Sequence, residues 1–493
     1  MSYDYRILIG GELTKAASSE TMEVTNPANG EVIARVPKCG TEDVDRAVAA
    51  AEAAREGWRA TYVGERAELL FKVAEILRAH QNELIPIETA QYGGPISKTS
   101  RFDIPFAHKE FEYIAGLGRG LTGLTISGDP NARMMTVREP HGVVGLITPW
   151  NFPLVTAVSK LAPALITGNT VVLKPASCAP LTVLRLGEYI KEAGIPDGVV
   201  NIITGPGNTV GEAIVTHPGV AKINFTGDSH VGKRIYELAA SRVMPVASEL
   251  GGKNAMIVLD DADLDGAVQG AVHGAFFNSG QNCGSPSRFY VQEGIYDAFV
   301  ERFIRSASKV TVGDPMDPAT MMGPLAYMDC RVTAERFIEN AKAAGAAVLL
   351  GGEPPRGELA KGAYVLPTLF EVHDNKMELM QEEIFAPVVG IMKIRSGEEG
   401  AALTNDCRYG LCASVWTQDY LKGMKLLDKL DVGTAWLNQH LAIVSETPWG
   451  GRKESGWTKE NSVLVLDEYT WQKHVWIHME SDPKTFWKDM ISL

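Results

Sequence analysis

The feature that most constrains the fold is a series of short apolar segments separated by segments with helical periodicity. Apolar runs of strand length occur at residues 142–148, 170–174, 199–204 and 255–259. Segment 65–80 carries leucine, isoleucine and valine along one helical face. Because apolar strands that alternate with helices are typical of a parallel sheet covered on both faces, we expect an α/β protein. A further strand and helix series at 288–312 and 335–350 predicts a second α/β unit.

The length of 493 residues exceeds what one hydrophobic core supports and predicts two or three domains. Segments 121–140 and 469–478 depart from the α/β pattern, because they alternate polar with apolar residues and no crossover helix follows the first. Two isolated strands are marginally stable alone. These segments therefore form either a local hairpin patch or a small β-domain.

Charge and cysteine usage exclude several classes of function. A net charge of −13 and a pI near 5.4 argue against nucleic acid or an anionic membrane as partner. The six cysteines have no framework spacing and no Cys-x-x-Cys pair, and the ten histidines are dispersed, so we expect free thiols and no metal site. No signal-peptide pattern and no run of about 18 apolar residues is present, which predicts a cytoplasmic protein without membrane contact.

Two glycine-rich segments carry groups suited to covalent catalysis. Segment 278–284, NSGQNCG, contains Cys283, and segment 249–254, ELGGKN, begins with Glu249. A thiolate can attack a carbonyl, and a carboxylate can activate the water that releases the adduct. Glycines allow backbone N–H groups to approach the reacting carbonyl closely. The alternative is structural: a single cysteine is usually a small buried hydrophobe, and a glutamate before glycines often lies at a turn.

These segments, with 148–153, 225–232, 382–388 and 448–456, occur in the order found in the aldehyde dehydrogenase superfamily, which the chain resembles from about residue 25 to about 456. The resemblance implies a Rossmann-like dinucleotide-binding domain, a second α/β catalytic domain and a small β oligomerisation domain. It implies boundaries at 1–120 with 141–251, at 252–455, and at 121–140 with 456–493. A homodimer or homotetramer is expected.

The resemblance also implies a mechanism. Cys283 attacks the aldehyde, and Asn151 with the Cys283 amide holds the oxyanion. After hydride transfer to NAD or NADP, Glu249 activates the water that hydrolyses the thioester to a carboxylic acid. Lys160, on the helix after Asn151, matches a family lysine that orients the relay, and a structural role is the alternative.

The expected cofactor-binding residues lie at several strand ends and loops: Thr148, Pro149, Trp150, Lys174, Ser177, Gly207, Gly211, Phe225, Gly227, Asp228, Ser229, Gly232, Leu250, Glu383 and Phe385. Asp228 stands where the family usually has serine, so we expect it to cap the following helix while Ser229 supplies the neutral hydroxyl. NAD-selective members commonly carry glutamate three residues after the lysine. Because Ser177 stands there, NADP is expected to be accepted beside NAD.

The substrate pocket implied by the resemblance combines aromatic and small polar side chains: Phe152, Val155, Thr156, Ser159, Phe277, Asn282, Ile443, Val444 and Trp449. Succinate-semialdehyde enzymes of the family carry arginine where Ser159 stands, so a distal carboxylate is disfavoured. A medium-sized, aromatic aldehyde is the expected substrate.

Two other functions are alternatives to hydrolytic aldehyde oxidation. CoA-acylating semialdehyde dehydrogenases characteristically lack the general-base glutamate, whereas Glu249 is present here. A catalytically retired structural protein would be expected to have lost Cys283, Glu249 or Asn151, and all three are present.

Overall fold

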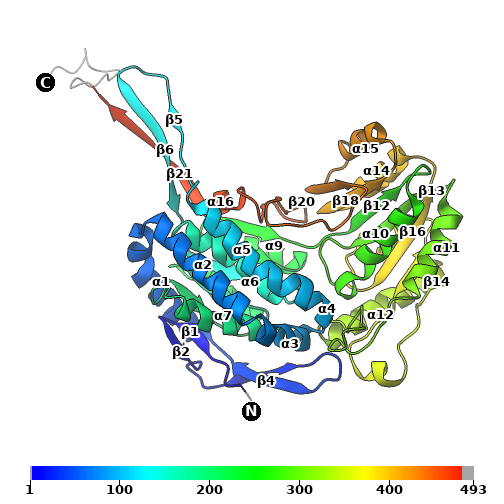
Figure 1. Ribbon diagram of the computed structural model, residues 1–493, viewed down its shortest axis with the longest axis horizontal. Helices are drawn as coiled ribbons and strands as arrows, with labels where there is room; N and C mark the ends of the chain where they lie inside the picture. Colours follow the sequence, from blue (N-terminus) through cyan, green and yellow to red (C-terminus); the bar gives the residue numbers. More distant parts are fainter. Residues whose placement is uncertain (1–2, 480–493) are drawn as a thin grey trace.

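The computed structural model has two α/β lobes, and a narrow β arm projects from the first of them (Figure 1). The structure describes residues 3–479. Residues 1, 2 and 480–493, which the expected boundaries 1–120 and 456–493 include, lie outside the described residues.

The first lobe is built on a seven-stranded sheet in the order β11-β10-β7-β8-β9-β1-β2. Its strands are β1 (Ile7–Ile9), β2 (Glu12–Thr14), β7 (Val143–Ile147), β8 (Thr170–Lys174), β9 (Val200–Ile202), β10 (Lys222–Thr226) and β11 (Val246–Glu249). Strands β7 to β11 are parallel, and β1 and β2 are added antiparallel at one edge. The strands predicted at 142–148, 170–174 and 199–204 are confirmed.

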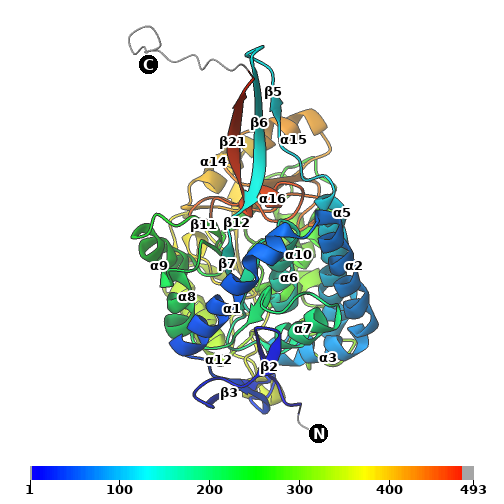
Figure 2. The same ribbon diagram turned by 90° about the vertical axis from the view of Figure 1, so that its left-hand side faces the viewer.

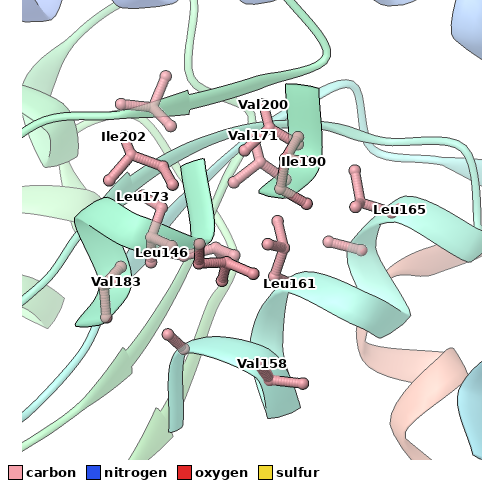
Figure 3. Close-up of a cluster of buried hydrophobic side chains, with 14 of the residues drawn as sticks. Leu146, Val158, Leu161, Leu165, Val171, Leu173, Val183, Ile190, Val200 and Ile202 are labelled. Carbon is pink, nitrogen blue, oxygen red and sulfur yellow. The ribbon is translucent and has the colours of Figure 1, made fainter. Parts of the chain in front are cut away.

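Helices cover both faces of this sheet. They are α1 (Thr41–Ala60), α2 (Val63–Ala79), α3 (Gln81–Tyr92), α4 (Ile96–Lys98), η1 (Thr99–Asp103), α5 (Ile104–Gly118), α6 (Pro153–Ile166), α7 (Leu181–Glu192), η2 (Gly207–Gly211), α8 (Glu212–Thr216) and α9 (Ser229–Ala240). Successive residues of β7 face opposite sides of the sheet. A Cβ on Gly145 would lie 2.6 Å from Ile214 of α8 on one side, whereas the next residue, Leu146, packs with Val158 and Leu161 of α6 on the other (Figure 3). This alternation explains why the strands are apolar throughout, and α2 confirms the helix predicted at 65–80.

The second lobe contains another seven-stranded, mainly parallel sheet, in the order β14-β15-β16-β13-β12-β18-β19. Its strands are β12 (Asn254–Val258), β13 (Pro286–Gln292), β14 (Ala347–Leu350), β15 (Thr368–Glu371), β16 (Val388–Ile394), β18 (Cys412–Trp416) and β19 (Thr434–Leu437). Its helices are α10 (Leu264–Phe276), η3 (Phe277–Gly280), α11 (Tyr296–Ala307), α12 (Met328–Ala343), η4 (Gly357–Lys361), α13 (Glu378–Gln381), α14 (Gly397–Asn405) and α15 (Tyr420–Leu427). The predicted second α/β unit is confirmed.

Three small elements complete the body. Strands β3 (Thr21–Thr25) and β4 (Val32–Pro37) form an antiparallel hairpin, β17 (Tyr409–Gly410) pairs with β20 (Arg452–Lys453), and α16 (Val465–Glu468) precedes the last strand. Tyr469, which the sequence pattern grouped with the following strand, is fully buried in the first core and bonds Asn224 through its hydroxyl at 2.7 Å.

The arm is a three-stranded antiparallel sheet of β5 (Thr125–Ile126), β6 (Ala132–Pro140) and β21 (Thr470–His478), in the order β21-β6-β5. The register runs from Thr470 opposite Pro140 to His478 opposite Ala132. The two predicted strands thus pair with each other although they are more than 300 residues apart in sequence. Both views show the arm extending away from the lobes (Figures 1 and 2).

Candidate active site

A cavity of about 620 Å³ is lined by side chains of both lobes, a size suited to a small-molecule ligand. The first lobe contributes the chain that follows β7, β10 and β11. Because the carboxyl ends of parallel strands meet at one sheet edge, residues distant in sequence converge there. The second lobe contributes the loop after η3, the start of α12 and segment 383–385.

Cys283 lies in this cavity on a loop with left-handed backbone conformations. Asn278 (φ 55°), Ser279 (φ 57°) and Gly280 (φ 70°) turn the chain sharply after α10. A Cβ on Gly284 would lie 2.9 Å from both Leu441 and Trp449, so glycine allows these side chains to close over the thiol. Burial, and then the Glu249 carboxylate, raises the pKa of the Cys283 thiol above its usual range. The thiol therefore needs a proton acceptor before it can attack.

Asn151 is bonded to the cysteine loop in both directions. Its side-chain Nδ2 donates to the Gln281 backbone carbonyl at 3.0 Å, and its backbone carbonyl accepts from Asn278 Nδ2 at 2.9 Å. The side chain is buried and lines the same cavity as Cys283. One of the two Nδ2 hydrogens is used on Gln281, which leaves the other for an oxygen in the cavity.

Glu249 ends strand β11 and also lines the cavity. It is 3% exposed, and its Oε1 has no hydrogen-bond partner among the described residues. Burial and then the Glu460 carboxylate raise the pKa of Glu249 well above its usual value, while Lys160 and Lys459 oppose the shift. A buried carboxyl with a raised pKa and an open oxygen is suited to take a proton from water or from a thiol.

Lys160 is fully buried on α6 and forms an ion pair with Glu460, and its Nζ also donates to Asn224 Oδ1 at 2.6 Å. Glu460 lines the cavity and is fixed by two backbone hydrogen bonds to Trp449, at 2.8 and 2.7 Å. Sequence reasoning missed Glu460, because no local pattern distinguishes it. The structure thus places Lys160 behind Glu460 and not in the lining of the cavity.

Helix α9 has a carboxylate cap at its N-terminus. Asp228 Oδ1 accepts from the backbone N–H groups of His230 at 2.8 Å and Val231 at 3.4 Å, so the cap expected from sequence is present. Ser229 is placed differently from the expectation, since its hydroxyl donates to the Glu454 carbonyl at 3.3 Å and does not line the cavity. Gly227 lines the cavity beside Asp228.

Lys174 is the last residue of β8 and Ser177 follows it, and neither lines the main cavity. Lys174 is 4% exposed and donates to the Pro175 carbonyl at 3.1 Å, and burial lowers the pKa of its ammonium to about 8. Ser177 is half-buried and donates to the Gly205 carbonyl at 2.8 Å. The buried, thinly solvated ammonium is the kind of group that a ribose or phosphate oxygen would satisfy.

The remaining expected cofactor residues fall into two groups. Those that line the cavity are Pro149, Trp150, Leu250, Glu383 and Phe385. Those that do not line it are Thr148, Gly207, Gly211, Phe225 and Gly232. The Phe225 ring fills the space where a Cβ on Gly227 would lie (2.5 Å), and Leu250 fills the corresponding space beside Gly232 (2.5 Å). The two glycines therefore allow these side chains to pack directly against the backbone.

Glu383, Phe385 and Trp150 form a second face of the cavity. Glu383 Oε1 accepts from the Gly252 amide at 2.9 Å, and burial raises the pKa of Glu383 to about 7. The rings of Trp150 and Phe385 meet edge to face at 5.3 Å. Thr148 Oγ1 is buried without a hydrogen-bond partner among the described residues. These polar atoms and flat rings fit a nucleotide with ribose hydroxyls.

The substrate side of the cavity combines aromatic rings with aliphatic and small polar side chains. Eight of the nine expected residues line it: Phe152, Val155, Thr156, Ser159, Phe277, Asn282, Ile443 and Trp449. Val444 does not line it, and half of its side-chain surface is exposed (50%). Sequence reasoning missed Phe102, Phe106 and His273, although the four-residue spacing of the two phenylalanines indicates one helical face. Within residues 3–479 no cluster of His, Cys, Asp and Glu could hold a metal, and no helix is long and apolar enough to cross a bilayer.

Comparisons with known proteins agree with this geometry. The family model described as "Aldehyde dehydrogenase family" matches residues 13–475. The chain is similar to an aldehyde dehydrogenase from Bacillus cereus, with 39% identity, a TM-score of 0.95 and 97% of each chain covered. It is also similar to a betaine aldehyde dehydrogenase from Staphylococcus aureus solved with NAD+, with 37% identity, a TM-score of 0.95, and 98% of this chain and 96% of that one covered. The chain therefore belongs to the aldehyde dehydrogenase family and is an NAD(P)-dependent aldehyde dehydrogenase.

Proposed function

We propose that Cys283 is the nucleophile and Glu249 the general base of a hydrolytic aldehyde dehydrogenase, which converts an aldehyde to its carboxylic acid. The observation that carries this proposal is that both side chains line one cavity, where Glu249 is buried with an unpartnered oxygen. CoA-acylating relatives need no such base. The presence of Glu249 at this place therefore favours water over CoA as the acceptor of the acyl group.

The nucleophilic step begins with loss of the Cys283 proton, which Glu249 can accept within the same cavity. The sulfur then attacks the aldehyde carbon, and the new C–S bond places a negative charge on the former carbonyl oxygen. Asn151 Nδ2 and the Cys283 backbone N–H stabilise that oxygen, and removal of one such donor costs roughly 3–4 kcal/mol in other enzymes. Bound NAD or NADP supplies a hydride acceptor, so that a thioester remains on Cys283.

Thioester hydrolysis requires the ionised form of Glu249, so the proton taken from Cys283 must first leave to solvent. The carboxylate then removes a proton from the attacking water. The pKa of Glu249 is raised, mainly by burial, so the fraction of ionised base grows as the pH increases. Lys160 acts through Glu460 as a positioning residue, because its ammonium contacts Glu460 and not the cavity. The Lys160 charge also favours the ionised form of Glu249.

The cofactor would be held by residues at the first sheet's carboxyl edge and by the Glu383 face. Lys174 and Glu383 offer a donor and an acceptor to ribose hydroxyls, and Phe385 and Trp150 offer flat apolar contacts. The S. aureus structure named above contains NAD+. The neutral Ser177 supports use of NADP as well, because no carboxylate at that position repels a 2′-phosphate.

The substrate best supported by the cavity is a medium-sized aromatic aldehyde. The wall contains several phenyl rings together with the small hydroxyls of Thr156 and Ser159. Neither hydroxyl can replace the bidentate grip of an arginine on a distal carboxylate. Aldehydes with a second carboxyl group are therefore expected to be poor substrates.

The arm supports a homo-oligomer in which β21 lies at a subunit contact. Trp471, Trp476 and Ile477 are about half exposed on it, at 47%, 52% and 45%. Exposed large apolar side chains on a projecting sheet edge mark an interaction surface. The oligomerisation unit would consist of the arm alone. The residues between 456 and the arm would belong to the first lobe, because Gly456 pairs with Glu249 and α16 contacts α6.

The compartment best supported by the sequence is the cytoplasm. All six cysteines are free thiols, which suits a reducing environment.

A pair of variants tests the mechanism. Cys283→Ala is expected to abolish turnover and the burst of reduced cofactor, whereas Glu249→Gln should retain a single-turnover burst and lose steady-state acid formation. Cys39→Ala, which removes a buried thiol that does not line the cavity, is the control. Assays with and without CoA distinguish the acceptors. Near wild-type turnover in Cys283→Ala, or acyl-CoA as the product, would contradict the proposal.

A further inference from the structure

Two polar side chains in the cavity lining have no hydrogen-bond partner within residues 3–479. Ser159 and Asn461 are each 5% exposed, and both line the cavity. Neither the Ser159 hydroxyl nor the Asn461 side-chain amide bonds another residue of that range, and neither group is sealed inside the protein as Thr148 Oγ1 is. Buried polar groups normally have a partner. These two are therefore available to a ligand in the cavity.

The helical repeat of α6 directs Ser159 into the cavity. Phe152, Val155, Thr156 and Ser159 follow one another at helical spacing, and all four line the cavity. Ser159 is the last of them, roughly 10 Å along the helix axis from Phe152, and so it is the one furthest from Asn151. Thr156 Oγ1 donates to the Phe152 carbonyl at 2.8 Å, whereas Ser159 makes no such bond to its own helix. The Ser159 hydroxyl is thus free at the end of the cavity away from the oxyanion donor.

Asn461 is held beside this place by its backbone and by a neighbouring ion pair. Its φ of 57° lies in the left-handed region, which asparagine adopts more readily than most residues. The preceding residue, Glu460, is fixed by its two backbone bonds to Trp449 and forms the ion pair with Lys160, the residue after Ser159. The ion pair thus ties together the two segments that carry Ser159 and Asn461. Groups fixed before a ligand arrives lose little entropy on binding it.

The two groups together complement a neutral hydroxyl. The Asn461 amide oxygen can accept the proton of a ligand hydroxyl, and the Ser159 hydroxyl can donate to its oxygen. A carboxylate is disfavoured, because Glu249 and Glu460 line the cavity and no lysine or arginine among residues 3–479 does. A quaternary ammonium group has no proton to donate to the amide oxygen, and the Glu460 carboxylate is already paired with Lys160.

We propose that Ser159 and Asn461 form a subsite for a neutral hydroxyl, so that the preferred substrate is an aromatic aldehyde with a hydroxyl group on the ring. The phenyl rings of the cavity contact the substrate ring, and the subsite distinguishes a hydroxyl from a methyl group of similar size. A methyl group would displace water from the two polar side chains without replacing its hydrogen bonds. This inference rests on the aldehyde oxidation proposed above and names its substrate class.

Two pairs of aldehydes of similar shape test the subsite in the wild-type enzyme. The 3- and 4-hydroxyphenylacetaldehydes are compared with the 3- and 4-methyl compounds, in which a CH₂ group separates the aldehyde from the ring and keeps its reactivity alike. We expect kcat/KM of at least one hydroxyl isomer to exceed that of its methyl counterpart by about tenfold or more. Ratios near one for both pairs, or a higher kcat/KM for betaine aldehyde than for either hydroxyl compound, would overturn the proposal.

Variants then assign the preference to the two side chains. Asn461→Gly removes the amide and keeps a residue that adopts positive φ without strain, and the hydroxyl-over-methyl ratio should fall roughly fivefold. Ser159→Ala should lower the same ratio about threefold and supplies the comparison if Asn461→Gly does not fold. The matched control is Ser462→Gly, at the next residue, which has φ 54° and does not line the cavity. An unchanged ratio in the first two variants, or an equal fall in the control, would refute the subsite.

The proposed function and the subsite fail in different ways. If none of the four arylacetaldehydes gives reduced cofactor or acylation of Cys283, the oxidation of aromatic aldehydes itself is wrong. If the methyl compounds are oxidised as efficiently as the hydroxyl compounds, that oxidation stands and only the subsite at Ser159 and Asn461 is wrong.

Discussion

Removing the charge of Glu460 and removing that of Lys160 should shift the pH dependence of hydrolysis in opposite directions. Glu460 raises the pKa of Glu249 and Lys160 lowers it. Because only ionised Glu249 can accept a proton, activity rises with pH through this pKa. Glu460→Gln removes the like charge and leaves the Lys160 ammonium, so the rising limb should move to lower pH. Lys160→Met removes the opposite charge, so the limb should move to higher pH.

The expected size follows from simple electrostatics. A unit charge about 6 Å away, at an effective dielectric constant of about 20, contributes about 3 kcal/mol, or about two pKa units. Water in the cavity reduces this effect, so we expect about one unit in each direction. The double variant Lys160→Met with Glu460→Gln is neutral at both positions and should return the limb near its wild-type pH.

The assay is kcat as a function of pH, with the burst of reduced cofactor used to confirm that hydrolysis limits turnover. Breaking a buried pair costs about 3–5 kcal/mol, so Tm of each variant must first show a folded protein at the assay temperature. Limbs that move in the same direction in both single variants would refute the assignment of Glu249 as the titrating base.

Three further changes test other parts of the site and the fold. Asn151→Ala should lower kcat by about 10²- to 10³-fold with little change in KM, because it removes an oxyanion donor; a loss below about threefold would contradict that role. Ser177→Glu should shift the ratio of kcat/KM for NAD over NADP toward NAD by roughly tenfold, or about 1.4 kcal/mol, and an unchanged ratio would show that residue 177 does not face the ribose. Truncation after Tyr469 removes β21 but keeps Tyr469 in the core of the first lobe, and light scattering should then report smaller or aggregated species; an unchanged oligomer would exclude the arm as the subunit contact.

Much of the architecture was predictable because strand burial leaves a direct record in sequence. The run 170–174 is apolar because both faces of β8 are covered, and the structure has the strand at the same residues. Positions 469–478 were predicted as a strand from alternation alone. Their pairing partner was not predictable from local pattern, since the register with 132–140 depends on how the two lobes bring distant segments together.

The candidate site could be proposed from sequence where glycine-rich motifs surround Cys283 and Glu249, and the structure brings both side chains to one cavity. Glu460 was not found, because its importance comes from burial beside Lys160 and not from neighbours in sequence. The hydroxyl of Ser229 was assigned to the cofactor from its place in the motif. In the structure this hydroxyl donates to the Glu454 carbonyl, a contact between residues far apart in sequence that a local motif does not indicate.

The position of Tyr469 has a consequence for synthesis of the chain. This residue fills the core of the first lobe and bonds Asn224 on β10, so that core is incomplete until residue 469 has been synthesised, long after the rest of the first lobe. Strand β21, which follows immediately, completes the arm after that. Contacts of such long sequence separation form late and slowly. The nascent chain therefore acquires β21, the proposed subunit contact, only after the strands of both lobes have been synthesised, which limits premature association between unfinished chains.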